Sequence, residues 1–220
     1  MVTYKLHLIR HGITQGNLEG KYIGRTDLDL CEEGKNELFE LLKTKEYPQV
    51  QKVYSSPMKR CVQTSQILFE DKYIQTVDGL KEYDFGDFEG KTLLELKDNP
   101  YFLKWMESGT QEAPPNGEEK ANFDLRLVEA VDFIIKDMMA NSITSAAVVA
   151  HGGVFMNILA SLCMPKRKPL QWTVGNGRGY TIATSAQMWS RDKILEVYDS
   201  LPYNDEQTSV MRGYESLSVD

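Results

Sequence analysis

Two short apolar segments, far apart in the chain, each end in a histidine followed by glycine, and this pair constrains the fold most. Residues 4–9 are Tyr-Lys-Leu-His-Leu-Ile and precede Arg10-His11-Gly12, and residues 146–150 are Ala-Ala-Val-Val-Ala and precede His151-Gly152-Gly153. Both segments are typical of short buried strands. If the strands are parallel neighbours, both histidines lie at the carboxyl edge of one sheet, where α/β proteins usually bind ligands.

The chain between and beyond these segments alternates β-prone and helical patterns. Further strands are expected over 52–55, 73–77, 180–184 and 194–198, and amphipathic or apolar helices over 32–47, 57–69 and 154–163, with one long helix after residue 116. This alternation predicts an α/β protein with three α/β/α layers and a mostly parallel central sheet.

Three details of these helices are specific enough to check. Leu38, Leu41 and Leu42 are expected on the buried face of the first helix. Ser56 is expected to cap the next helix ahead of Pro57. Asn116 and Glu119 have the spacing of a capping box that would begin the long helix.

The length of 220 residues suits one domain with an insertion. We expect a single domain over residues 1–200 and a polar tail over 201–220. Residues of about 85–117 combine short helical patterns with a Pro-rich loop, so this segment is expected to form a small helical cap over the ligand site.

The net charge of −7 argues against a nucleic-acid or anionic membrane surface, so any anion site must be a local positive pocket. No apolar run has the length of a membrane span, and no signal-peptide pattern is visible at the start. Cys31, Cys61 and Cys163 are widely spaced, which is typical of reduced thiols. These features predict a cytoplasmic protein.

The residues around the first histidine are those that handle phosphate. The Arg10 guanidinium can bind a phosphoryl group bidentately, and the His11 imidazole can attack phosphorus or carry a proton. Arg60 lies in the first turn of a predicted helix, where a cation opposes the helix dipole and therefore suggests a bound anion. The free amides of Gly152 and Gly153, at the start of another helix, would point at the same anion.

An acidic loop follows the third predicted strand. Glu82, Asp84, Asp87 and Glu89 alternate there with aromatic residues. A carboxyl group over a phosphate pocket would have a raised pKa and would serve as a general acid, and any of the four is a candidate on composition alone. His7 lies inside the first strand and is interpreted as structural.

The combined motifs resemble those of the histidine phosphatase superfamily, in its phosphoglycerate mutase-like branch. The matching segments occur in the family's order and comprise Arg10-His11-Gly12-x-Thr14-x-x-Asn17, Ser55-Ser56-Pro57-Met58-Lys59-Arg60-Cys61-x-Gln63-Thr64, Leu80-x-Glu82-x-x-x-Gly86-x-x-Glu89-Gly90 and His151-Gly152-Gly153.

The resemblance implies a role for each matching position. His11 would be the nucleophile that takes the phosphoryl group, Arg10, Arg60 and His151 would hold the phosphoryl oxygens, and Glu82 would protonate the leaving oxygen. The substrate-binding positions would be Asn17, Thr14, Gly24 and Gly152. No metal and no cofactor is expected.

Within the family the chain is more similar to the phosphatases than to the mutases. The segment from Phe85 to Gly117 is short and has Lys91, Lys97 and Lys104 as its cations, whereas a mutase needs a closed basic pocket for a second phosphate. The expected function is metal-independent hydrolysis of a small phosphate ester, with α-ribazole phosphate and sugar or nucleoside phosphates as candidates. A cofactor-dependent phosphoglycerate mutase and a non-catalytic phospho-ligand binding protein remain alternatives.

The leaving group and the assembly stay open at this level. Tyr22, Tyr83, Phe85, Phe102 and Trp105 would form either an apolar wall for an aromatic or nucleoside-like leaving group or the core of the cap. The expected partner is a small molecule, with no nucleic acid and no membrane, and the protein is expected to be a monomer or a homodimer.

Overall fold

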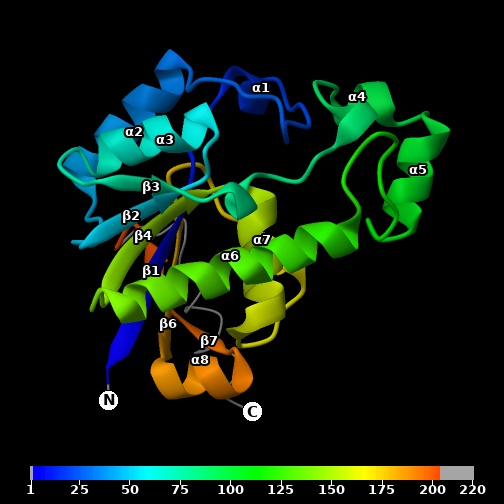
Figure 1. Ribbon diagram of the computed structural model, residues 1–220. Coiled ribbons are helices and arrows are strands. Elements are labelled where there is room, and N and C mark those ends of the chain that lie inside the picture. The colour runs from blue at the N-terminus through cyan, green and yellow to red at the C-terminus, as the bar shows by residue number, and fades with distance from the viewer. Residues whose placement is uncertain (1, 204–220) are drawn as a thin grey trace, which may run out of the picture.

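The computed structural model describes residues 2–203 and contains a seven-stranded sheet flanked by helices (Figure 1). The order of strands across the sheet is β3-β2-β4-β1-β6-β7-β5. The strands are β1 (Thr3–Arg10), β2 (Lys52–Ser55), β3 (Ile74–Thr76), β4 (Ser145–Ala150), β5 (Cys163–Met164), β6 (Gly179–Ser185) and β7 (Leu195–Leu201). β6 runs antiparallel to both of its neighbours, whereas all other pairs are parallel.

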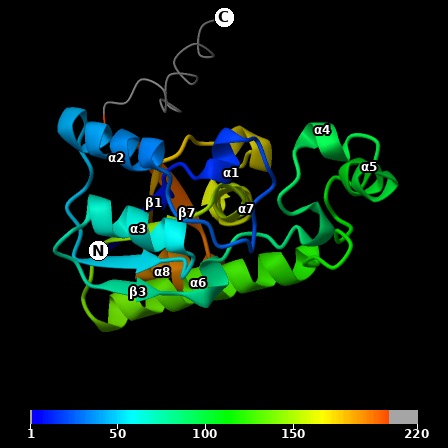
Figure 2. The same cartoon turned by 90° about the horizontal axis from the view of Figure 1, so that it is seen from above.

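The helices lie on both faces of this sheet, which confirms the predicted three layers (Figures 1 and 2). They are α1 (Gln15–Leu18), α2 (Glu32–Thr44), α3 (Lys59–Leu68), α4 (Leu93–Leu96), α5 (Pro100–Glu107), α6 (Lys120–Ala140), α7 (Gly152–Leu162) and α8 (Ala186–Asp192), with 3-10 turns at Asp78–Leu80, Gly86–Phe88 and Pro169–Trp172.

The two faces of the sheet form two cores because side chains alternate along each strand. Leu8 of β1 and Val148 of β4 pack with α6 and α7 in the larger core. Ile9 and Val149, one residue further on, pack with α2 and α3 in the smaller one. The helices thereby fix the orientation of the strand ends, where the ligand site was predicted.

Each of the three helix details predicted above is wrong in whole or in part, beginning with those of α3 and α2. The α3 helix begins at Lys59 with Met58 as its N-cap, and the hydroxyl of Ser56 instead bonds to His151, 2.9 Å away. Leu42 is exposed, because the apolar face of α2 is narrower than its sequence pattern indicates.

The predicted start of the long helix is also wrong. Glu119 is the N-cap of α6, and Asn116 has a positive φ of 58° and donates its side-chain amide to Asp87. Since its side chain is committed to the neighbouring loop, Asn116 does not form the predicted capping box.

The segment expected to be a cap stands beyond the rest of the fold. α4 and α5 project to one side of the sheet in both views (Figures 1 and 2). Phe88, Leu96, Phe102 and Trp105 are buried and join the larger core. The inserted helices are therefore packed against the domain and do not form a core of their own.

The end of the domain lies slightly later than predicted. β7 continues to Leu201, and the Tyr203 amide donates to the Glu46 carbonyl, so the first residues of the expected tail are part of the fold. The rest of that tail lies outside the described residues. Within residues 2–203, no helix is both long and apolar enough to cross a membrane.

Candidate active site

The two histidines lie at the same edge of the sheet, as the sequence predicts. β1 and β4 are parallel neighbours, with Arg10 opposite Ala150, so His11 and His151 follow directly at the carboxyl ends of the two strands. Their ring centroids are 5.2 Å apart and the rings meet edge to face. Both side chains are buried, with 5% and 0% of their surface exposed.

The His11 ring is held with a nucleophilic nitrogen available. Its Nδ1 lies 2.7 Å from the Gly12 carbonyl oxygen, which can only accept, so Nδ1 carries the proton and Nε2 has a free lone pair. Burial lowers the pKa of His11 well below its ordinary value, and the charges of Arg60 and Arg10 lower it further. The imidazole is therefore neutral at neutral pH, as attack on phosphorus requires.

His151 is fixed in the opposite way. Its Nδ1 accepts from Arg60 Nε at 3.3 Å, so its Nε2 carries the proton and faces Ser56 Oγ at 2.9 Å. Burial lowers the pKa of His151 well below its ordinary value, and the nearby Arg60 adds to the effect. His151 thus brings an N–H group, and no positive charge, beside His11.

Arg60 joins three separate segments of the site. Besides His151, its guanidinium donates to the carbonyl oxygens of Thr26 at 2.9 Å and Gly24 at 2.8 Å. The side chain is 1% exposed. A guanidinium has five N–H groups, so two remain for a phosphoryl oxygen. Gly24, predicted to bind substrate, instead holds Arg60 through its carbonyl.

The loop that holds Arg60 is itself organised by Glu89. This carboxylate accepts from the backbone amides of Gly24, Arg25 and Thr26, at 2.9, 2.8 and 3.1 Å, and from the Thr26 hydroxyl at 2.6 Å. Three amides directed at one carboxylate fix the course of the loop, and with it the two carbonyls that face Arg60. Glu89 is therefore a positioning residue.

Replacing Glu89 by glutamine is expected to lower kcat/KM about 10- to 100-fold and to destabilise the fold by about 2 kcal/mol, because an amide nitrogen cannot accept from the loop. Thermal unfolding and kinetics with p-nitrophenyl phosphate measure both effects. The matched control is Glu112→Gln, since Glu112 is exposed and pairs with Lys104 at 2.9 Å far along the cap. Equal behaviour of the two variants would contradict the role of Glu89.

Arg10 presents a donor with no partner. Its Nη1 donates to the Val174 carbonyl at 2.8 Å, but its buried Nε has no hydrogen-bond partner. A Cβ atom added to Gly152 would lie 3.5 Å from this Nε, so the glycine leaves space beside it. An unsatisfied buried N–H is costly and marks a place where an anion would be bound.

Glu82 is the buried acid of the site. Its Oε2 accepts from the Gly153 amide at 2.9 Å, and its Oε1 accepts from the Tyr83 amide at 2.9 Å. Burial nevertheless raises the pKa of this carboxyl, which favours the protonated form. A Cβ atom on Gly153 would come within 2.5 Å of Glu82 Oε1, so glycine is required there. Of the four loop acids, the structure singles out Glu82.

A second arginine holds the loop that carries this acid. Arg126 donates to the carbonyls of Gly79, Lys81 and Glu82, at 2.8, 2.6 and 3.0 Å, and its charge is paired with Glu118 at 2.6 Å. Arg126 thus fixes the backbone segment that carries Glu82.

The site opens into a cavity of about 350 Å³. Its wall contains the predicted residues Arg10, His11, Asn17, Glu82 and Gly152. Arg60 and His151 are not part of this wall. The wall also contains Gly153, Tyr22 and Phe85, which the sequence also indicated as candidates. The wall residues that were not predicted are Lys21, Ile23, Met156, Leu170, Thr173 and Val174.

Thr14 and Asn17 were both predicted to bind substrate, but only Asn17 lines the cavity, and the capping box of α1 joins the two side chains. Asn17 Oδ1 accepts from the backbone amide and the hydroxyl of Thr14, both at 3.0 Å, which leaves the amide group of Asn17 able to donate into the cavity. Thr14 is fully buried and lies outside the cavity wall. Its role in the structure is therefore to orient Asn17.

The contact of Asn176 with the backbone at His11 was not predicted from the sequence. The side-chain amide of Asn176 donates to the His11 carbonyl at 2.8 Å and to the Gly12 carbonyl at 3.3 Å, so it fixes the turn that follows β1. The Asn176-Gly177 pair indicates a turn in the sequence, but nothing in that signal connects it to His11.

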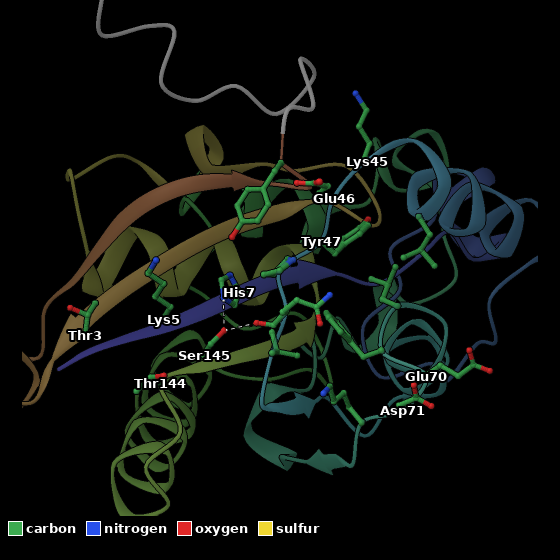
Figure 3. A pocket seen from close by; sticks show the side chains of 18 residues that line it. Thr3, Lys5, His7, Lys45, Glu46, Tyr47, Glu70, Asp71, Thr144 and Ser145 are labelled. Atoms are coloured by element: carbon green, nitrogen blue, oxygen red, sulfur yellow. Dashed lines mark hydrogen bonds between the residues drawn. The ribbon is translucent and has the colours of Figure 1, made fainter.

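A larger cavity, of about 990 Å³, lies at the other end of β1 and includes His7 (Figure 3). Both ring nitrogens of His7 are occupied, Nδ1 by Thr181 at 3.0 Å and Nε2 by Ser145 at 3.1 Å. Burial lowers its pKa to about 4, with a smaller effect from Lys5. This confirms His7 as structural, and the larger cavity lacks the phosphate-binding groups found around His11.

Comparison with known proteins agrees with this geometry. Adenosylcobalamin/alpha-ribazole phosphatase of Escherichia coli (strain K12) is 28% identical over 178 residues, which are 79% of this chain and 86% of the relative. Phosphoserine phosphatase 1 of Hydrogenobacter thermophilus is 30% identical over 122 residues, 54% of this chain and 58% of the relative.

The fold is shared with a solved structure of phosphoglycerate mutase from Bacillus anthracis, with a TM-score of 0.74 at 21% identity, over 90% of this chain and 92% of that one. Residues 6–194 match the family described as the histidine phosphatase superfamily (branch 1). This chain, with His11 and His151 at adjacent strand ends, belongs to that family.

Proposed function

We propose that this protein hydrolyses small phosphate monoesters through a phosphohistidine at His11, without a metal ion. The observation that carries the proposal is the state of the His11 ring: its Nδ1 proton is held by the Gly12 carbonyl, its Nε2 keeps a lone pair, and His11 lines the cavity together with Arg10, whose Nε has no partner. The family membership and the names of the relatives support the same reaction.

The reaction has two balanced steps. His11 Nε2 attacks phosphorus, the bond from phosphorus to the leaving oxygen breaks, and the proton of Glu82 passes to that oxygen. A water molecule then attacks the phosphohistidine, Glu82 takes one of its protons, and inorganic phosphate and neutral His11 are released. The unpartnered Nε of Arg10 and the two N–H groups of Arg60 that have no protein acceptor stabilise the charge on the phosphoryl oxygens, which is the main requirement of phosphoryl transfer. The His151 N–H joins them when a phosphoryl oxygen replaces Ser56 as its acceptor.

The composition of the cavity supports a phosphatase over a mutase. The cations on its wall are Arg10 and Lys21, and Lys21 is paired with Glu19 at 2.5 Å. A mutase has to retain a bisphosphorylated intermediate, which needs additional cations for the second phosphate. A hydrolase only has to admit water.

The test is hydrolysis of p-nitrophenyl phosphate with and without EDTA, followed by a quench that preserves phosphohistidine. Turnover that survives EDTA, with label bound to the protein, would support the proposal. Loss of turnover with EDTA would overturn metal independence. Interconversion of phosphoglycerates that depends on 2,3-bisphosphoglycerate, without net phosphate release, would favour the mutase.

Replacing Glu82 by glutamine is expected to separate substrates by their leaving groups. Turnover of ethyl phosphate, whose leaving oxygen needs a proton, should fall by about 10²- to 10⁴-fold, whereas p-nitrophenyl phosphate should lose about tenfold or less. Steady-state kinetics with both esters measure this. The control is Asp84→Asn, in the same loop; an equal loss for both esters in Glu82→Gln would assign the proton donor elsewhere.

The pH dependence has a definite sign. The pKa of Glu82 is raised by burial, so kcat/KM for ethyl phosphate should fall as pH rises through that pKa and the acid loses its proton. The pKa of His11 is lowered by burial, so activity should fall again in stronger acid as the nucleophile is protonated. Profiles of kcat/KM, corrected for ionisation of the ester, should lose the alkaline limb in Glu82→Gln and keep the acid limb.

The natural substrate is proposed as a small alcohol-derived ester. The names of two relatives point to α-ribazole phosphate and phosphoserine, and sugar or nucleoside phosphates fit the same chemistry. We also place the activity in the cytoplasm, a proposal supported by three cysteines that form no disulfide in the structure.

A further inference from the structure

A second, smaller cavity adjoins the first on the side of the proton donor. It has a volume of about 130 Å³ and shares Glu82, Phe85, Gly153 and Met156 with the cavity at His11. In the proposed reaction the leaving oxygen lies next to Glu82. The group attached to that oxygen by a short link would therefore enter the smaller cavity.

Four aromatic side chains form one part of the wall of this cavity. Tyr83 packs edge to face with Phe123 and with Phe85, at centroid distances of 5.2 and 5.4 Å, and Phe85 does so with Trp105 at 6.2 Å. All four side chains line the cavity. Because an apolar cavity of about 150 Å³ accommodates benzene, this one has room for a single ring and not for a two-ring base.

Two polar atoms in this wall are unsatisfied. The Tyr83 hydroxyl and the Trp105 Nε1 are buried without a hydrogen-bond partner. The two groups lie near each other, since a contact from the Trp105 N–H lowers the pKa of the Tyr83 hydroxyl, but this contact does not reach hydrogen-bond geometry. Burial dominates and raises the pKa of Tyr83 to about 12. A buried indole N–H is a donor and nothing else, so an acceptor on a bound molecule would satisfy it.

Apart from Arg10, which is assigned to the phosphoryl group, the cations that line the two cavities are paired with carboxylates. Lys120, which lines the smaller cavity, lies 2.5 Å from both carboxylate oxygens of Asp124. Lys21, in the larger one, pairs with Glu19. A leaving group with a carboxylate or a second phosphate would find no uncompensated positive charge there. The lining favours an uncharged group.

We infer that the smaller cavity is the leaving-group subsite, and that it selects an uncharged single ring with a hydrogen-bond acceptor directed at Trp105 Nε1. The inference rests on the proposed phosphatase activity and narrows it. Among the ester classes named above, it favours a compact ring on a short link over phosphoserine and over two-ring nucleosides.

The test compares matched esters. Benzyl phosphate carries a ring without an acceptor, the three pyridylmethyl phosphates have the same shape with a ring nitrogen, and ethyl phosphate has no ring. We expect kcat/KM for benzyl phosphate to exceed that for ethyl phosphate about tenfold. At least one pyridylmethyl isomer should exceed benzyl phosphate by a further factor of about five to ten.

Trp105→Phe should remove the advantage of that pyridylmethyl ester over benzyl phosphate, so that the ratio of their kcat/KM values falls to about one. The matched control is Trp172→Phe, because Trp172 Nε1 is also buried without a partner but does not line either cavity. The control should keep the wild-type ratio of the two esters. Equal loss of the ratio in both variants would overturn the assignment to Trp105.

Binding of the product alcohol gives a readout that does not depend on turnover. In nitrogen-15 spectra, titration with the matching pyridylmethanol should shift the Trp105 indole signal, identified by its absence in Trp105→Phe, and leave the Trp189 signal unchanged. Trp189 is a suitable reference because its Nε1 is bonded to Asp132. A Trp105 signal that does not move would overturn the inference.

The outcomes separate the two proposals. If p-nitrophenyl phosphate and every other ester remain intact, the phosphatase proposal fails, and the subsite that rests on it fails too. If p-nitrophenyl phosphate is hydrolysed but ethyl, benzyl and pyridylmethyl esters react with equal kcat/KM, the phosphatase proposal stands and only the leaving-group subsite is wrong.

Discussion

His11→Ala is expected to abolish phosphatase activity, with kcat reduced by about 10⁴-fold or more. The variant removes the proposed nucleophile, so the proposed phosphate-binding groups Arg10, Arg60 and His151 remain but no side chain is left to accept the phosphoryl group in the proposed mechanism. Steady-state hydrolysis of p-nitrophenyl phosphate measures the loss, and a rapid quench should show no phosphate bound to the protein.

The matched control is another histidine of the same strand. His7→Gln retains a side chain that can hydrogen-bond to Thr181 or Ser145, so it is expected to lose about 1–3 kcal/mol of stability and to keep its activity. His11→Ala protein with a wild-type unfolding temperature and undiminished turnover would refute the phosphohistidine mechanism.

Replacing Arg60 is the second change with a large expected effect. Arg60→Lys should lower kcat/KM by about 10²- to 10³-fold, because an ammonium group cannot donate to two carbonyls, to His151 and to a phosphoryl oxygen at once. Arg60→Ala should in addition lose several kcal/mol of stability, since the buried Gly24 carbonyl and the Thr26 carbonyl lose their donor. Kinetics and thermal unfolding of both variants check these effects.

Lys59→Ala provides the control for charge at the start of α3. The Lys59 side chain is largely exposed and lies 3.9 Å from the Asp29 carboxylate, while its backbone amide bonds to Asp27. Activity and stability should therefore stay close to wild type. If Lys59→Ala and Arg60→Lys were equally impaired, the effect would reflect overall charge at this helix and not the contacts of Arg60.

The sequence by itself determined the framework of this protein. The apolar segments that end at His11 and His151 predict two short buried strands, because the side-chain pattern is a local property of each segment. Both rings were expected at one edge on the condition that the strands are parallel neighbours, and the structure meets this condition. The same reasoning identified Arg10 and, from a cation that opposes a helix dipole, Arg60. His7 was recognised as structural because it lies inside a strand.

Only the tertiary structure decided how these groups are held. Ser56 was expected to cap a helix and instead faces His151, because a buried imidazole competes for the same hydroxyl. Glu89, which lies 29 residues after Arg60 in the chain, fixes the loop that holds Arg60. The sequence left four candidate acids. In the structure Glu82 differs from the other three because it is buried, which raises its pKa, and because it accepts a hydrogen bond from the Gly153 amide. Such contacts join segments distant in sequence, and local patterns carry no information about which partner a buried polar group will find.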